Sequence, residues 1–83
     1  MPLFMDRHLK VDGLTAAAVA DAHRRDLEVQ SAHGVNYRQY WFDEDSGTVF
    51  CLVEAPNAEA AHAVHRAAHG LLADEIVPVR EGV

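Results

Sequence analysis

The sequence has little of what disulfide-rich, nucleic-acid-binding or membrane proteins need. Cys51 is the only cysteine, so no disulfide can form within the chain. Lys and Arg number 7 against 13 Asp and Glu, and the formal charge of −6 is opposite to what a phosphate-binding surface needs. No stretch approaches the roughly 20 apolar residues of a membrane span, and residues 1–6 lack the basic start of a signal peptide. We therefore expect no nucleic-acid or membrane partner and a cytoplasmic location.

The composition is that of an ordinary globular domain. Of the 83 residues, 49% are hydrophobic and 24% are charged, which is far from the signature of disorder. A chain this short forms one domain over residues 1–83 and buries only about two-thirds of its unfolded surface. Small scaffolds are often stabilised by disulfides, a metal or oligomerisation. Because disulfides are excluded, a metal ion or a second subunit becomes more probable.

Turn and capping signals divide the chain into six elements. Thr15 and Asn57 are typical N-caps, and Gly34 and Gly70 are typical stop signals after helices. Pro78 indicates that the last strand lies at a sheet edge. The expected helices cover 16–32 and 58–68, and the expected strands cover 3–9, 35–42, 48–53 and 76–79.

This β-α-β-β-α-β order predicts an α+β domain of the ferredoxin-like kind, an antiparallel sheet with two helices on one face. The third strand is apolar on both sides, with Val49, Cys51 and Val53 alternating with Phe50 and Leu52. A sheet with one wet face should alternate apolar and polar residues. Since two helices cover only one face, we expect the other face to pair with a second copy of the chain in a homodimer.

Histidine is the unusual feature of the composition, with 6 in the chain. His62, His65 and His69 share one flank of the second helix, at spacings of three and four residues that bring imidazoles within mutual reach. Glu59 is the nearest carboxylate in sequence. The trio predicts a site for a divalent transition metal, although polar surface histidines are the plain alternative.

Two further histidines have carboxylates nearby. His23 falls in the apolar stripe of the first helix, three residues before Asp26, and we expect it to be at least partly buried. Such a pair suits metal ligation or acid–base catalysis, and a structural histidine bonded to a neighbour is the alternative. Asp6 and His8 lie on the same side of the first strand and could also ligate a metal. Cys51, in mid-strand, is interpreted as a packing residue.

Four stretches of the chain together resemble the small bacterial family known as DUF4242, the nickel-binding-protein-like ferredoxin-fold proteins. The resemblance covers nearly the whole chain and implies a dimeric ferredoxin-like fold, with nickel bound by at least one member. It matches His8, His23, Asp26, His65 and His69 to similar places in the family. The stretches are Phe4-Met5-Asp6-Arg7-His8, Ala22-His23-Arg24-Arg25-Asp26, Val49-Phe50-Cys51-Leu52-Val53-Glu54-Ala55-Pro56 and Val64-His65-Arg66-Ala67-Ala68-His69-Gly70.

The sequence therefore favours a metal-binding protein, for nickel by resemblance, that serves in sequestration or detoxification. Imidazoles also bind Zn²⁺ and Cu²⁺, so the residues alone do not select the metal. The alternative is a small enzyme of the dimeric α+β barrel kind, with His23 and Asp26 as acid–base residues acting on a small organic substrate. Known catalytic motifs are absent from the sequence, which favours the non-enzymatic interpretation. The candidate metal ligands are His65, His69, His62, His8 and His23.

Overall fold

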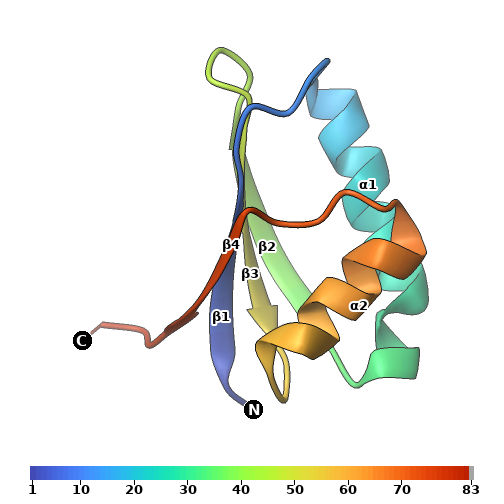
Figure 1. Cartoon of the computed structure of the whole chain (residues 1–83), viewed down its shortest axis with the longest axis vertical. Coiled ribbons are helices and arrows are strands. Elements are labelled where there is room, and N and C mark those ends of the chain that lie inside the picture. Colours follow the sequence, from blue (N-terminus) through green and yellow to red (C-terminus); the bar gives the residue numbers. More distant parts are fainter. Residues whose placement is uncertain (83) are drawn as a thin grey trace.

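A computed structural model describes residues 1–82 as one layer of sheet with both helices packed on the same face (Figure 1). The sheet order is β2-β3-β1-β4, and neighbouring strands are antiparallel. The ferredoxin-like α+β fold expected from the sequence is confirmed. The elements are β1 (Leu3–His8), α1 (Ala16–Val29), β2 (Asn36–Asp43), β3 (Thr48–Glu54), α2 (Ala58–Ala68) and β4 (Glu75–Val79).

The helix starts follow the capping residues. The side chain of Thr15 accepts a hydrogen bond from the Ala18 amide at 3.1 Å, and that of Asn57 accepts one from the Ala60 amide at 2.9 Å. These caps satisfy backbone donors that have no partner within the helix. The expected start of each helix is thereby confirmed.

Other boundaries differ from the expectation by small amounts. α1 ends at Val29 rather than Ala32, because residues 30–33 tighten into a 3-10 turn that Gly34 closes in the left-handed conformation (φ 66°). The strands differ from the expected ranges by one residue. β4 lies at an edge of the sheet, as Pro78 indicated.

The core lies between the inner face of the sheet and the helices, and it holds ionisable side chains in its middle. Asp6, His8, Asp26 and His65 are all buried there. The apolar stripe expected for α1 is rotated, since Asp26 faces the core and Leu27 is 44% exposed. On α2, His65 lies inside the core rather than on the flank. The buried apolar residues are Val19, Val35, Tyr37, Val49, Cys51, Val53, Ala55, Ala61 and Val64.

The outer face of the sheet carries exposed apolar side chains. Trp41, Phe50 and Val77 are 47%, 38% and 41% exposed, and no helix of residues 1–82 covers them (Figure 1). Residues Phe50 and Leu52 thus point away from the core, as the alternation along β3 predicted. Within residues 1–82, neither helix has both the length and the apolar character needed to cross a membrane.

Candidate metal centre

Four side chains from three elements meet in the core. Asp6 and His8 come from β1, Cys51 comes from β3 directly opposite Asp6, and His65 comes from α2. Each is buried, and each offers one ligand atom within 4.8 Å of the others. Two imidazoles, one carboxylate and one thiol form a mixed nitrogen, oxygen and sulfur donor set. We call these four residues the core cluster.

His65 lies at the centre of the cluster and uses both ring nitrogens. Its Nε2 lies 2.8 Å from Asp6 Oδ2, and its Nδ1 lies 3.0 Å from Asp26 Oδ1. An imidazole that donates to two carboxylates carries a proton on each nitrogen. Burial alone would lower the pKa of His65, but the hydrogen bonds to Asp26 and Asp6 and the charges of both carboxylates raise it to about 9. Without a metal, His65 is therefore an imidazolium at neutral pH.

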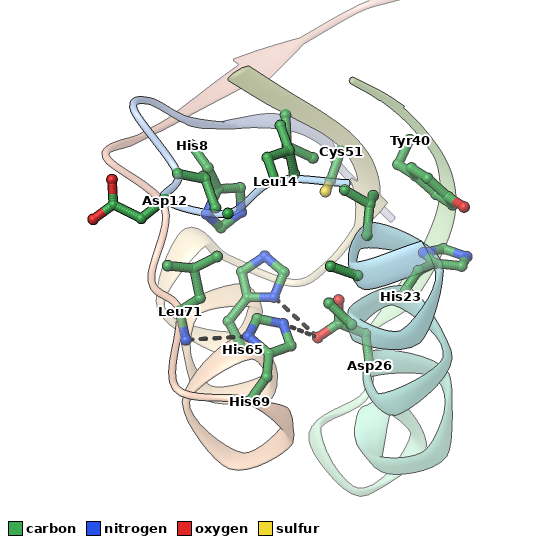
Figure 2. A pocket seen from close by; sticks show the side chains of 16 residues that line it. His8, Asp12, Leu14, His23, Asp26, Tyr40, Cys51, His65, His69 and Leu71 are labelled. Atoms are coloured by element: carbon green, nitrogen blue, oxygen red, sulfur yellow. Dashed lines mark hydrogen bonds and ion pairs between the residues drawn. The ribbon is translucent and has the colours of Figure 1, made fainter. Parts of the chain in front are cut away.

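Asp26 joins α1 to α2 through two histidines. Its Oδ1 accepts a hydrogen bond from His65 Nδ1 and a second from His69 Nε2, each at 3.0 Å (Figure 2). The Leu71 amide donates to His69 Nδ1 at 3.1 Å, which assigns the proton of His69 to Nε2. Burial would raise the pKa of Asp26, but these hydrogen bonds outweigh it and lower the pKa. Asp26, His65 and His69 are a second group of metal-ligand side chains that shares His65 with the core cluster.

Asp6 is held as a carboxylate with no solvent around it. Burial would raise its pKa, but the hydrogen bond from His65 and the proximity of the His8 ring keep the pKa well below its usual range. The Tyr37 hydroxyl donates to Asp6 Oδ2 at 3.1 Å and lies 2.9 Å from His65 Nε2. Tyr37 thus fixes both members of the Asp6–His65 pair.

Two buried atoms of the core cluster lack a hydrogen-bond partner among residues 1–82, namely Asp6 Oδ1 and His8 Nδ1. His8 Nε2 lies 3.5 Å from Asp6 Oδ1, which is long for a hydrogen bond. Buried polar atoms are normally paired, so each exception needs an explanation. A cation coordinated by Asp6 Oδ1 and His8 Nε2 would supply the missing partner of the carboxylate. The residues therefore fit a metal ion.

Cys51 contributes the sulfur of the core cluster. The thiol is free and buried, and burial together with the charge of Asp6 raises its pKa. It packs in the core, as expected from its place in β3. Its position beside Asp6 could not be expected from the sequence, because that contact comes from the pairing of β1 with β3.

The structure brings together three of the five histidines that the sequence singled out as candidate ligands: His8, His65 and His69. His62 is half-buried on α2 and belongs to neither group, although its Nδ1 also lacks a partner among residues 1–82. Glu59, the carboxylate nearest in sequence, faces Arg66 at 3.8 Å instead. The carboxylates beside the histidines are those of Asp6 and Asp26.

His23, the other candidate, is half-buried, and its ring lies 4.7 Å from that of Tyr40. Burial lowers its pKa, although the charge of Asp26 acts in the opposite direction. His23 and Asp26, the two residues of the enzyme interpretation, line one cavity together. Asp26 Oδ1, however, accepts hydrogen bonds from His65 and His69 and none from His23.

Comparisons with known proteins identify one family and one similar solved structure. The family described as "Nickel responsive protein SCO4226-like" matches residues 4–79. The crystal structure of SCO4226 from Streptomyces coelicolor A3(2) is 42% identical in sequence and superposes with a TM-score of 0.90. That match covers 98% of this chain and 99% of the other. No curated protein matches.

Proposed function

The chain belongs to the SCO4226-like family of nickel-responsive proteins, and we propose that it binds a divalent transition metal, nickel by its family, in order to sequester the ion. The proposed ligands are Asp6, His8, Cys51 and His65. The observation that carries this proposal is the unpaired Asp6 Oδ1, a carboxylate oxygen buried beside three further metal ligands. A buried carboxylate oxygen with no partner is costly unless an ion or proton meets it.

The surroundings of His65 support its role as a ligand. Metal-binding histidines almost always donate their second N–H to a carboxylate or carbonyl, which fixes the ring and raises its basicity. His65 Nδ1 makes this bond to Asp26, and His69 holds Asp26 from the other side. We therefore propose that His65 Nε2 binds the metal, and that His69 positions Asp26 rather than binding the ion itself.

The donor set suits borderline metals. Imidazole nitrogen suits Ni²⁺, Zn²⁺ and Cu²⁺, whereas thiolate sulfur disfavours Mg²⁺ and Ca²⁺. The family description, which names a nickel-responsive protein, supports nickel among the three. A bound ion would supply charge neutralisation at Asp6. His65 Nε2 and Cys51 Sγ each release a proton to become ligands, so the affinity rises with pH.

Titration calorimetry with Ni²⁺ on the wild type and on Cys51→Ala and His8→Ala tests the ligand assignment. Losing one of four ligands should weaken binding by at least tenfold. His62→Ala is the matched control, because His62 is a histidine of α2 outside both ligand groups, and it should bind as the wild type does. Wild-type affinity in both core variants, or a loss only in His62→Ala, would place the metal elsewhere on the chain.

A spectroscopic measurement separates the core cluster from the neighbouring group. X-ray absorption of the nickel-loaded protein should show one sulfur neighbour, which only Cys51 can supply from residues 1–82 apart from the thioethers of Met1 and Met5. The sulfur signal should vanish in Cys51→Ala. A shell of nitrogen and oxygen alone in the wild type would instead favour Asp26, His65 and His69.

We also propose that the protein acts as a cytoplasmic homodimer joined through the outer face of the sheet. Trp41, Phe50 and Val77 give this face its apolar character. Exposed apolar patches of this kind mark interaction surfaces. In a dimer with two-fold symmetry, the same patch of each subunit packs against its copy on the other. Phe50→Glu should give a monomer by light scattering at micromolar concentration, and Leu27→Glu, an exposed site on α1, should stay dimeric. A monomeric wild type would refute this interface.

A further inference from the structure

A cavity of about 120 Å³ leads from solvent to the core cluster (Figure 2). Three of the four proposed metal ligands, His8, Cys51 and His65, line it, and all three are buried. Leu14 and Leu71 also line the cavity, but Leu14 is half-buried and Leu71 is exposed, so these two residues form its rim. An ion that reaches the core cluster by this path has to pass the rim.

One side of the rim, the loop before α1, is fixed to the rest of the fold. The Val11 amide donates to the Gly47 carbonyl at 2.9 Å, which ties the loop to the turn between β2 and β3. The Ala16 amide donates to Glu44 Oε1 of the same turn at 3.2 Å. Val11 and Leu14 also pack against the core. This side of the rim therefore cannot move without disturbing the core.

The opposite side of the rim is formed by residues 70–73, which join α2 to β4 and which we call the strap. In Figure 2 the strap runs along the side of the cavity opposite α1. The Gly70 amide donates to the His65 carbonyl at 2.8 Å, and Asp74 Oδ2, just past the other end, accepts a hydrogen bond from the Leu9 amide at 2.6 Å. Gly70 has a φ of 78°, and no atom lies within 4 Å of where its Cβ would be, so the strap has a hinge residue at the end of α2.

Leu71 connects the strap to a metal ligand. Its amide donates to His69 Nδ1 at 3.1 Å. His69 Nε2 donates in turn to Asp26 Oδ1, and the same oxygen accepts a hydrogen bond from His65 Nδ1, each at 3.0 Å. The Leu71 side chain lines the cavity although it is 42% exposed. Leu71 therefore blocks the path with few apolar contacts to lose when the strap moves.

We propose that the strap is a lid over the path to the core cluster, and that its opening sets the rate at which small molecules and metal ions reach and leave this site. For metal ions, this inference rests on the proposed function. Lids control exchange by moving a few residues about a hinge. The hydrogen bonds through His69 and Asp26 favour the closed lid when His65 is held in place, so a bound ion slows its own release.

The first test uses metal-free protein and follows the modification of Cys51 by a small neutral thiol reagent. Leu71→Ala should accelerate it at least about fivefold, the factor expected when the contacts of about half a leucine side chain are lost from the barrier. Leu72→Ala is the matched control, because Leu72 is also 42% exposed in the strap but is not among the residues that line the cavity, and it should react as the wild type does. Urea unfolding of each variant corrects for differences in global stability.

The second test measures the release of nickel from the loaded protein to an excess of chelator by stopped-flow absorbance. Leu71→Ala should release nickel faster than Leu72→Ala by the same factor, whereas calorimetry should give the two variants the same affinity, because neither side chain is a proposed ligand. Asp74→Ala frees the far end of the strap and should also accelerate release, although Asp74 is not among the residues that line the cavity.

The lid is overturned if Cys51 reacts equally fast in Leu71→Ala and Leu72→Ala once stability is taken into account. It is also overturned if both variants bind nickel and release it at the same rate, a result that leaves the proposed metal function standing. A wild type that binds no nickel refutes the proposed function instead, and the reaction rates of Cys51 then decide the lid alone.

Discussion

The stability of the metal-free protein should fall as the pH rises from 6.5 to 8.5. His65 has an ordinary pKa of 6.5 when unfolded, and its carboxylate partners raise the folded value to about 9. A raised pKa contributes stability that is fully present below 6.5 and is lost as the pH rises through about 9. At 1.36 kcal/mol per pKa unit, the full contribution is about 3 kcal/mol. About 2 kcal/mol of it disappears between pH 6.5 and pH 8.5.

The assay is urea unfolding of the chelator-treated protein at several pH values in this range, with the pKa of His65 followed directly by NMR. The range stops at pH 8.5, because burial also raises the pKa of Cys51 and ionisation of the unfolded thiol adds a loss of the same sign above it. Asp26→Asn removes one partner of His65 and should flatten the slope. A wild-type stability that stays constant or rises across the range would refute the assignment of an imidazolium between Asp6 and Asp26.

Three further outcomes follow from the same contacts. Tyr37→Phe removes the hydroxyl that donates to Asp6 and should lower the free energy of unfolding in urea by about 1–3 kcal/mol; an unchanged value would mean that Asp6 does not need this donor. Gly47→Ala should destabilise more than Gly13→Ala, since both residues have positive φ but a Cβ at Gly47 would lie 3.0 Å from the Val11 amide nitrogen and one at Gly13 meets nothing within 4 Å. The Cys51 thiol should react with a thiol reagent at pH 8 only as fast as the protein opens, and rapid labelling of the native protein would contradict its burial.

The fold could be predicted because its signals are local. Thr15 and Asn57 cap the helices where polar side chains at helix starts are expected to, and β3 is a short run rich in β-branched and apolar residues, which is typical of a strand. Asp6 and His8 could be placed together for the same reason, since period-two alternation puts both on one face. None of these inferences needed a contact between distant parts of the chain.

The site could be predicted only in part, because its central contacts are distant in sequence. α1 is rich in alanine, which gives little contrast between its faces. The sequence therefore centres the buried stripe on His23, whereas the structure shows it running through Val19 and Asp26. β2 carries a bulge between Tyr37 and Gln39, and the shift brings both Tyr37 and Tyr40 to the inner face. The sequence of β2 contains no pattern that predicts this bulge. The position of Tyr37 beside Asp6 therefore had to come from the structure.

The position of the ionisable residues in the core is consistent with the proposed metal site and is not what stability alone would favour. A chain of 83 residues has a thin core, and here its centre holds Asp6, His8, Asp26 and His65 instead of apolar side chains. Replacing a buried ionic group by well-packed apolar residues is often neutral or stabilising. Sequences depart from the rules of folding mainly at functional sites. His65 of α2 contacts Asp6 of β1 through Nε2 and Asp26 of α1 through Nδ1, so its imidazole connects the sheet to both helices. A metal ion that replaced the proton on Nε2 would therefore change the contact between the sheet and the helices.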